Sequence, residues 1–245
     1  MIEAIMETLI TMKLSGMAEG VREQAASHVY RDLSFEERLG LLVDKERLHR
    51  ENRQIKILLA HAHLRHPSAC VENIDFKARR GITRDIIIRL SQNEWVARHQ
   101  NVIIVGPTGA GKTYLACALG NSAVRQGTST IYVRLPRLIQ ELKIARADGR
   151  YVKFLSRLQR IKLLIVDDWG INPFADEARR DFLEIMEDRH DVRSTIIASQ
   201  FPIDTWHEII GDATLADAIC DRVVHNAHKI TLTGESMRKT HSGLT

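Results

Sequence analysis

The chain has 245 residues, of which 44% are hydrophobic, and a formal net charge of +4. This length supports one full α/β domain with a smaller appendage, and the mild positive charge favours an anionic partner without identifying it. No apolar run approaches the roughly 18 residues of a membrane span, and the acidic, apolar N-terminus lacks the basic region of a signal peptide. We therefore expect no membrane association. The three cysteines are far apart in the sequence and are interpreted as reduced thiols, so we expect a cytoplasmic protein.

Residues 1–67 show helical patterns and no strand pattern, which predicts a small helical N-terminal domain. One amphipathic helix is indicated by apolar residues at Ile5, Leu9, Met12 and Met17. A second, long helix begins at a capping box, in which Ser34 is followed by Glu37. Its apolar pattern continues to Leu64, and Pro67 ends it.

The later part of the long helix is basic, with few acidic residues to oppose the charge. Arg50 and Arg53 are our candidates in this stretch for contact with nucleic-acid phosphates. A solvated helix face explains the same charges equally well, and this stretch alone leaves both interpretations open.

Residues 68–100 are predicted as a basic connector with a helix from Asp85 to Trp95. From residue 101 to residue 245, strands alternate with helical segments. The predicted strands are Val102–Val105, Thr130–Leu135, Leu163–Val166, Thr195–Ser199 and Lys229–Leu232. This alternation predicts an α/β fold, a parallel sheet with helices on both faces. Ligands of such sheets bind beyond the carboxyl ends of the strands, so we expect the chemistry there.

The first of these strands leads into a glycine-rich loop and then into a helix from Tyr114 to Gln126. The loop fits G-x-x-x-x-G-K-[ST], the phosphate-binding loop of nucleotide triphosphatases, in the strand-to-helix context that the motif requires. Its glycines let backbone N–H groups wrap a phosphate, and the helix directs its positive dipole end there. Lys112 reaches the β- and γ-phosphates, and the Thr113 hydroxyl ligates Mg²⁺. The predicted nucleotide contacts are Gly106, Pro107, Thr108, Gly109, Ala110, Gly111, Lys112, Thr113 and Tyr114.

A second nucleotide motif, Walker B, is an apolar strand that ends in two carboxylates, Asp167 and Asp168. We expect Asp167 to hold the Mg²⁺ shell and Asp168 to orient or deprotonate the attacking water. Most ATPases of the AAA+ type carry glutamate at the second position, so the shorter Asp168 changes the reach to the water.

Three further polar residues follow the later strands. Gln200 ends the strand at 195–199, where it positions water or senses the γ-phosphate, or simply terminates the strand. Arg222 is a candidate arginine finger for a neighbouring subunit's nucleotide, with a local salt bridge to Asp217 or Asp221 as the rival interpretation. Arg238 either approaches the phosphates or is an ordinary basic residue near the end of the chain.

The segment between the second and third strands is unusually basic. In a ring or spiral of such domains it would face the axis, where it suits a nucleic-acid backbone without reading its sequence. Its candidate DNA-binding residues are Lys143, Arg146, Arg150, Lys153 and Arg157.

Together these motifs make the chain resemble the IstB/DnaC clade of AAA+ ATPases. The resemblance rests on the loop at 106–113, the strand at 163–168 with the following Trp-Gly, the strand tip at 195–200, Arg222 and the closing Gly-Glu-Ser-x-Arg at 234–238. The sequence Met-Lys-Leu-x-Gly-Met at 12–17 is similar to the IstB type, the transposition helper ATPases encoded beside a transposase.

The resemblance implies an AAA+ type sheet, and ATP and Mg²⁺ as cofactors. We expect the C-terminal helical lid of other AAA+ proteins to be missing, since only about a dozen residues follow Leu232. It also implies a homo-oligomer with nucleotide at its subunit interfaces, assembly on double-stranded DNA without sequence preference, and a cognate transposase that is recruited or activated. Arg222 matches the trans-acting arginine of the family. The missing lid puts the sensor role of Arg238 in doubt, Met237 stands where an aromatic residue is expected, and Gln200 replaces the asparagine of the DnaC branch.

Three other functions are compatible with the same motifs. A DnaC-type replicative helicase loader has the same catalytic domain but favours single-stranded DNA. A P-loop small-molecule kinase closes an arginine-rich lid over its acceptor and needs no trans-acting arginine. A nucleotide-gated scaffold uses assembly as its function and hydrolysis only to reset it.

Overall fold

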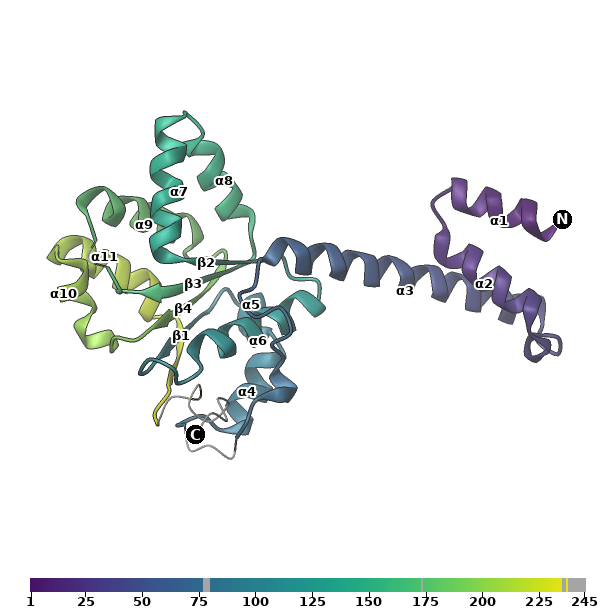
Figure 1. The fold of residues 1–245 in the computed structure, drawn as a ribbon, viewed down its shortest axis with the longest axis horizontal. Helices are drawn as coiled ribbons and strands as arrows, with labels where there is room; N and C mark the ends of the chain where they lie inside the picture. The colour runs from purple at the N-terminus through teal and green to yellow at the C-terminus, as the bar shows by residue number, and fades with distance from the viewer. Residues whose placement is uncertain (77–79, 173, 235–236, 238–245) are drawn as a thin grey trace, which may run out of the picture. The chain divides into compact units, whose positions relative to one another are not determined.

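The computed structural model describes residues 1–76, 80–172, 174–234 and 237. The chain divides into two compact units, Met1–Ile57 and Leu58–Thr245, and the long helix α3 (Phe35–Ala62) contributes residues to both (Figure 1). No helix among the described residues is long and apolar enough to cross a bilayer.

The N-terminal unit consists of α1 (Ile2–Thr11), α2 (Ser15–Ala26), the short 3₁₀ helix η1 (His28–Tyr30) and the first part of α3. The capping box of α3 is confirmed, because the Ser34 N–H donates to Glu37 Oε2 at 2.8 Å and the Glu37 N–H donates to Ser34 Oγ at 3.2 Å.

The prediction of a single amphipathic helix over Ile5–Met17 is wrong. Lys13 adopts the left-handed conformation, with φ of 61°, and separates α1 from α2. The Leu14 N–H then donates to the Leu9 carbonyl at 2.8 Å, a pattern that terminates α1. The apolar spacing continues across this break, so periodicity alone does not reveal it.

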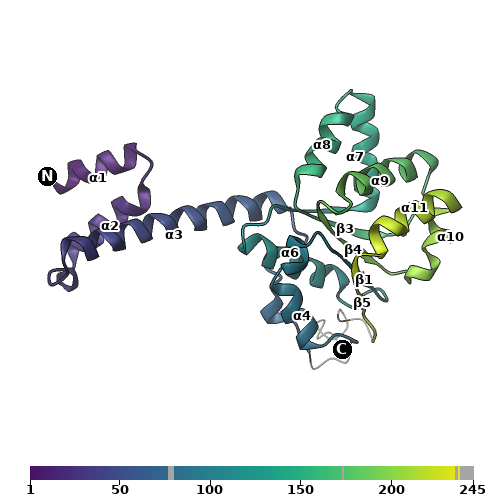
Figure 2. The same cartoon turned by 180° about the vertical axis from the view of Figure 1, so that it is seen from behind.

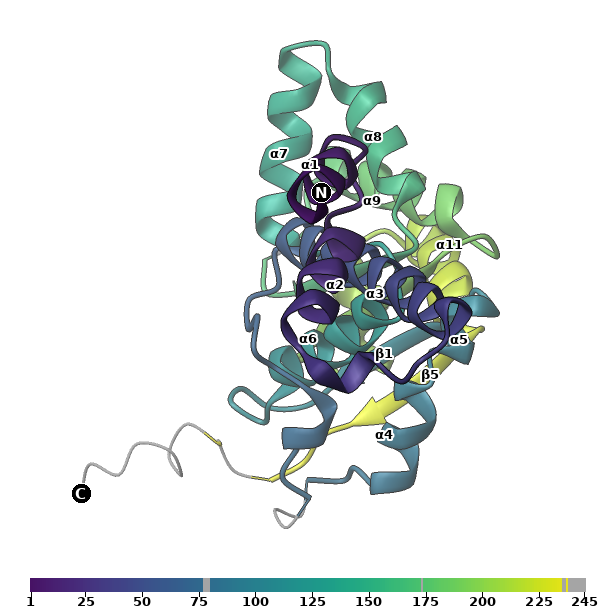
Figure 3. The ribbon, with the colours of Figure 1, turned by 90° about the vertical axis from the view of Figure 1, so that its right-hand side faces the viewer.

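Two glycines let α2 lie against α3 (Figure 3). A Cβ atom on Gly16 would stand 2.8 Å from the Lys45 carbonyl oxygen, and one on Gly20 would stand 2.7 Å from the Leu42 side chain. Larger residues at either position would push the two helices apart.

The second unit contains a five-stranded parallel sheet in the order β2-β3-β4-β1-β5. The strands are β1 (Asn101–Val105), β2 (Thr130–Arg134), β3 (Leu163–Trp169), β4 (Ser194–Ser199) and β5 (Ala227–Thr231). The predicted α/β class with a parallel sheet is confirmed. Strand β3 runs past Val166 to Trp169 with a register irregularity, so both predicted carboxylates belong to the strand itself.

Helices cover both faces of the sheet (Figures 1 and 2). One face carries η2 (Val71–Asn73), α4 (Arg84–Ser91), α5 (Glu94–Ala97) and α6 (Lys112–Arg125). The other face carries α7 (Leu135–Ala147), α8 (Tyr151–Arg160), α9 (Asp176–Arg189), η3 (Ile203–Thr205), α10 (Trp206–Ile210) and α11 (Ala213–Val224). Residues alternate between the two cores along each strand: Val102 and Ile104 pack with α6, and Ile103 and Val105 pack with the opposite layer.

The helix predicted from Asp85 to Trp95 is two helices, which corrects that prediction. Helix α4 ends at Ser91, and Asn93 adopts a left-handed conformation, with φ of 60°, before α5 begins. Trp95 remains a core residue, and its Nε1–H donates to the Leu90 carbonyl at 2.8 Å. That hydrogen bond fixes the turn between the two helices.

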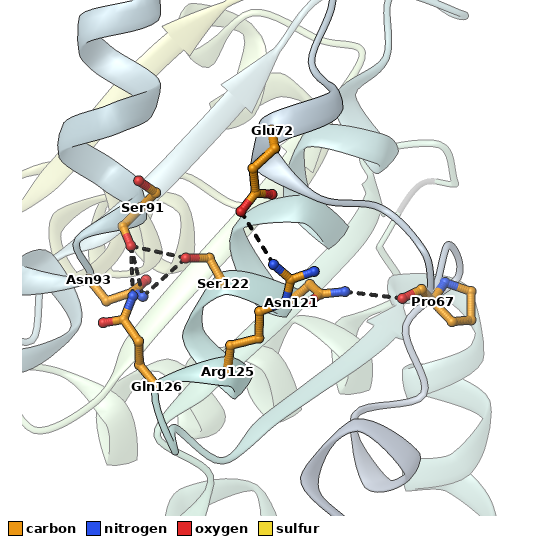
Figure 4. A network of polar contacts seen from close by, with 8 residues as sticks. All are labelled: Pro67, Glu72, Ser91, Asn93, Asn121, Ser122, Arg125 and Gln126. Atoms are coloured by element: carbon orange, nitrogen blue, oxygen red, sulfur yellow. Dashed lines mark hydrogen bonds and ion pairs between the residues drawn. The ribbon is translucent and has the colours of Figure 1, made fainter. Parts of the chain in front are cut away.

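Polar contacts fasten the segment before β1 onto α6 (Figure 4). The Ser91 carbonyl at the end of α4 accepts hydrogen bonds from Ser122 Oγ and Gln126 Nε2, both at 2.9 Å. Upstream of it, Asn121 Nδ2 donates to the Pro67 carbonyl at 3.1 Å, and Arg125 pairs with Glu72. Pro67, Glu72 and Ser91 are therefore each held against α6.

A buried arginine joins three segments of the opposite layer. Arg189 is 2% exposed at the end of α9. Its Nη1 donates to the carbonyls of Leu158 at 2.7 Å and Ile161 at 2.8 Å, and its Nη2 donates to the Ser194 carbonyl at 2.5 Å. Burial without a carboxylate partner among the described residues lowers the pKa of Arg189 to about 9.

Candidate functional site

The carboxyl ends of β1, β3 and β4 meet at a cavity of 620 Å³. Residues from the three predicted motifs line it: the glycine-rich loop, the two carboxylates that end β3, and the glutamine that follows β4. They are Thr108, Gly109, Gly111, Lys112, Thr113, Tyr114, Asp167, Asp168 and Gln200. Gly106, Pro107 and Ala110 belong to the same loop but do not line the cavity.

The backbone of the loop requires glycine at two of its fixed positions. Gly106 has φ of 150°, and a Cβ atom there would stand 2.4 Å from the Leu232 carbonyl oxygen. Gly111 has φ of 96° and immediately precedes α6, so its conformation turns the loop into the helix. Lys112 folds back over this loop, and its Nζ donates to the carbonyls of Gly106 at 2.8 Å and Pro107 at 2.9 Å.

Asp167 is held by hydroxyl groups from two other elements. It is 2% exposed, and its Oδ2 accepts hydrogen bonds from Thr113 Oγ1 at 2.8 Å and from the Tyr132 hydroxyl at 2.7 Å. Burial and the negative charge of Asp167 together raise the pKa of Tyr132 well above its ordinary value. Tyr132 was not predicted as a site residue, because nothing in the sequence shows that β2 lies next to β3.

Asp168 adopts a left-handed backbone conformation, with φ of 61°, in the irregular part of β3. Few non-glycine residues adopt this conformation, although aspartate does so more readily than most. Arg134 Nε donates to Asp168 Oδ2, and this hydrogen bond raises the pKa of Arg134. Arg134 was also missed, although it ends β2 in register with Asp167, and the rule that sites form at strand tips favours it.

Gln200 connects the tip of β4 to the glycine-rich loop. Its Oε1 accepts a hydrogen bond from Thr108 Oγ1 at 2.9 Å. The preceding Ser199 donates its hydroxyl hydrogen to the Trp169 carbonyl at 3.1 Å, which ties β4 to the end of β3. The three strand tips are therefore linked by side-chain hydrogen bonds.

The residues of the cavity suit a nucleotide with Mg²⁺. The hydroxyl of Thr113 and the carboxylate of Asp167 are hard oxygen ligands in direct contact, the kind that Mg²⁺ prefers. Among the described residues, no group of three or more His, Cys, Asp or Glu side chains forms a metal site by itself. That agrees with Mg²⁺, which commonly takes one or two protein ligands together with phosphate and water.

The rest of the cavity wall consists of residues that were not predicted as site residues. Those that precede β1 are Arg65, His66, Asn73, Ile74, Asp75 and Arg80, and those that follow it are Ile171, Ala198 and Met237. The Met237 N–H donates to the Gly109 carbonyl at 3.0 Å. No motif marks this wall, because its residues are brought to the loop by the fold.

Arg222 does not line the cavity. It lies on α11, 28% of its side chain is exposed, and its Nη2 forms an ion pair with Glu187 on α9 at 2.9 Å. Its Nη1 donates to the Ala218 carbonyl at 3.0 Å, and neither Asp217 nor Asp221 pairs with it. Arg238 lies outside the described residues, as does the end of the chain on which the prediction of a missing lid rests.

The basic segment between β2 and β3 forms a helical hairpin, α7 and α8, which lie side by side in Figures 1 and 3. Two of its candidate arginines are engaged within the chain. Arg146 pairs with Glu177 and Asp181 and stacks on the ring of Tyr151, while Arg150 pairs with Asp148. Three others are exposed without an ion pair in the described part of the chain: Lys143, Lys153 and Arg157.

In the N-terminal unit, Arg50 forms an ion pair with the buried Glu46 at 2.7 Å. Glu46 also accepts hydrogen bonds from the N–H groups of Gly16 and Met17. Burial acts to raise the pKa of Glu46, but the hydrogen bonds from Arg50 and the two amides together lower it below the ordinary value. Arg53 is exposed and has no ion pair with any described residue.

Comparison with known families and proteins gives a consistent assignment. The family model described as IstB-like ATP binding protein matches residues 7–245. A protein of Sinorhizobium fredii, named as an insertion-sequence ATP-binding protein, is 47% identical over 234 residues, covering 96% of this chain and 95% of the relative. Insertion sequence IS21 of Pseudomonas aeruginosa encodes another protein named for ATP binding, 33% identical over 97% of this chain and 88% of the relative.

Solved structures of AAA+ proteins share the fold. The chain resembles DnaI with a TM-score of 0.58 at 23% identity, over 73% of this chain and 94% of that one. It resembles the DnaC helicase loader with a TM-score of 0.55 at 18% identity, over 67% of this chain and 96% of that one. At these identities the likeness shows a common fold. The family match and the insertion-sequence relatives confirm the resemblance seen in the motifs: the chain belongs to the family of IstB-like ATP-binding proteins.

Proposed function

We propose that this protein is an ATPase that assists transposition by assembling on duplex target DNA with ATP and recruiting or activating a transposase. Family membership supplies ATP binding and an association with insertion sequences. The main observation in support of ATP hydrolysis is that one cavity is lined by Lys112, Thr113, Asp167 and Asp168. Binding alone does not require a second carboxylate there, whereas hydrolysis uses one to activate water.

In the proposed hydrolysis, a water oxygen attacks the γ-phosphorus of ATP, and the bond from that phosphorus to the β–γ bridging oxygen breaks. Asp168 accepts the proton of the water, and Gln200 orients the water or the γ-phosphate. Lys112 and the N–H groups of the loop offset the negative charge that develops on the phosphate oxygens. Thr113 and Asp167 would hold Mg²⁺, which neutralises charge on the β- and γ-phosphates.

Tyr132→Phe tests the support of the proposed metal ligand. It removes the hydroxyl that donates to Asp167 Oδ2 at 2.7 Å and keeps the ring in the core. Because hydrogen bonds to a metal ligand commonly tune metal affinity by about 10- to 100-fold, we expect the Mg²⁺ concentration for half-maximal ATP binding to rise about tenfold. A fluorescent ATP analogue titrated with Mg²⁺ measures it.

Tyr30→Phe is the matched control for this prediction, because the described residues give the Tyr30 hydroxyl no hydrogen bond. An unchanged Mg²⁺ requirement in Tyr132→Phe would show that the hydroxyl does not support a metal ligand.

We propose a homo-oligomer in which Arg222 serves the nucleotide of a neighbouring subunit. Its placement away from the cavity of its own chain, with part of its side chain exposed, supports this role. The ion pair with Glu187 fixes its direction on α11 and must loosen or redirect if the guanidinium reaches a phosphate.

For DNA, we propose that the exposed cations of the α7–α8 hairpin make the main backbone contacts. Lys153 and Arg157 lie one turn apart on α8 and have no ion pair in the described chain. Changing both to glutamine should lower the slope of log affinity against log salt concentration by about 2, since each phosphate contact contributes roughly 0.9.

The comparison variant for the DNA contact changes Arg50 and Arg53 to glutamine, which removes the same charge from the N-terminal unit. We expect it to leave the salt slope unchanged. A larger change in the slope for this pair than for Lys153 and Arg157 would move the main DNA contact to α3.

The function as a whole is tested by fluorescence anisotropy with labelled duplexes of unrelated sequence. We expect binding that needs ATP and Mg²⁺, varies little with sequence and is lost in Lys112→Ala. Equal binding without nucleotide would contradict an ATP-dependent assembly. A strong preference for single-stranded DNA would instead favour a helicase loader, the function named for the DnaC structure.

A further inference from the structure

Arg80 is a buried cation on the wall of the candidate site. The residue is 9% exposed and lines the same cavity as Lys112 and Thr113. Its guanidinium lies against the glycine-rich loop, because a Cβ atom on Gly111 would stand 3.0 Å from Arg80 Nη1. Gly111 is the residue at which the loop becomes α6, so the Arg80 side chain reaches the start of that helix.

Hydrogen bonds hold both the carbonyl and the side chain of Arg80. The Thr233 N–H donates to the Arg80 carbonyl at 2.9 Å, and Gly81, with φ of 77°, lies so close to β5 that a Cβ atom would stand 2.6 Å from the Thr231 carbonyl oxygen. The side chain is held as well, because Arg80 Nη2 donates to the Asp75 carbonyl at 2.5 Å. These contacts hold the guanidinium at the wall of the cavity.

Arg80 forms no ion pair with a carboxylate of the described residues, although Asp75, Asp167 and Asp168 line the same cavity. Its buried Nε has no hydrogen-bond acceptor in that part of the chain. Burying a guanidinium without an anion or a full set of acceptors is costly, and Lys112 adds a second positive charge to the same cavity. An anionic ligand next to Gly111 would supply Arg80 with a hydrogen-bond acceptor and an opposite charge.

We propose that Arg80 binds a phosphate group of the nucleotide, as a second cation beside Lys112 that the same chain supplies. The ligand class is a nucleoside di- or triphosphate, and the inference rests on the proposed nucleotide site. Arg80 is a binding residue in this role, and it belongs to no part of the phosphate-loop motif. The side chain reaches the loop from a residue that precedes β1 and whose carbonyl accepts a hydrogen bond from the Thr233 N–H.

The test compares Arg80→Met, Arg80→Lys and Arg84→Met, using ADP as the ligand so that turnover does not enter the measurement. Arg84 is an exposed arginine in the first turn of α4 and serves as the control. Affinity is measured with a fluorescent ADP analogue. The melting temperature is measured with and without ADP.

We expect Arg80→Met to bind ADP at least about tenfold more weakly, since a charged hydrogen bond to phosphate is lost. Its melting temperature without ADP should stay the same or rise, because an uncompensated buried charge is removed. The rise in melting temperature that ADP produces should shrink. Arg80→Lys should bind within about threefold of the wild type, and Arg84→Met should match the wild type.

A structural role for Arg80 gives the opposite pattern. Arg80→Met would then melt at a lower temperature without ADP, or would fail to fold. Any folded variant would show the full increase in melting temperature on addition of ADP. Each of these results overturns the proposal. Equal weakening in Arg80→Lys and Arg80→Met overturns it as well, because shape rather than charge would then matter. Failure of the wild type to bind ADP would instead count against the proposed nucleotide site itself.

Discussion

The Asp168→Asn variant will bind ATP as tightly as the wild type and hydrolyse it about 100 to 1,000 times more slowly. Asparagine has the size of aspartate and tolerates the left-handed conformation that Asp168 adopts, with φ of 61°. It cannot accept a proton from water, so the proposed base is lost while the loop and Lys112 remain. Phosphate release measures turnover, and equilibrium titration with a fluorescent ATP analogue measures binding.

Asp85→Asn is the control for this variant, because Asp85 is an exposed carboxylate in the first turn of α4 and lies outside the cavity. Undiminished hydrolysis in Asp168→Asn would remove Asp168 from the mechanism. If the non-hydrolysing variant still assembles on DNA with ATP and supports target capture, a nucleotide-gated scaffold describes the protein better than an ATP-driven machine.

The Arg189→Met variant will lose about 3 kcal/mol of folding free energy, which corresponds to a melting temperature lower by roughly 6–12 °C. The change withdraws the donors that serve the carbonyls of Leu158, Ile161 and Ser194 in a buried layer. Each weakened or orphaned carbonyl costs about 1–3 kcal/mol, and relief from burying an unpaired charge offsets part of the total. Denaturant unfolding monitored by circular dichroism measures the loss.

Arg180→Met provides the comparison for Arg189, since Arg180 is exposed on the same helix, α9. We expect it to change the free energy of unfolding by less than about 0.5 kcal/mol. Equal stability of the two variants would mean that the buried hydrogen bonds of Arg189 contribute no more than a solvated side chain.

Local sequence was sufficient to predict those residues of the cavity that are continuous in the chain. The phosphate loop needs glycines, Lys112 and Thr113 in one stretch between a strand and a helix, and that stretch is visible without a fold. The same holds for the apolar strand that ends in Asp167 and Asp168. The parallel sheet also followed from the alternation of strands and helices.

Residues that meet these motifs from other elements could not be predicted, because the order of strands in the sheet is a tertiary property. Tyr132 lies 35 positions from Asp167, and Arg134 lies 34 positions from Asp168. The same reason explains Arg222, whose partner Glu187 lies on another helix although two aspartates are nearby in sequence. The break at Lys13 was missed because apolar spacing is similar in one helix and in two.

Helix α9 contacts two surfaces for which we propose different partners, DNA for the α7–α8 hairpin and a neighbouring subunit for Arg222. Asp181 holds Arg146 of the hairpin, and Glu187 holds Arg222, about 9 Å further along the helix axis. A helix is stiff over so short a length, so a displacement of the hairpin by the proposed DNA contact would be transmitted along α9 to Arg222 at the proposed subunit interface.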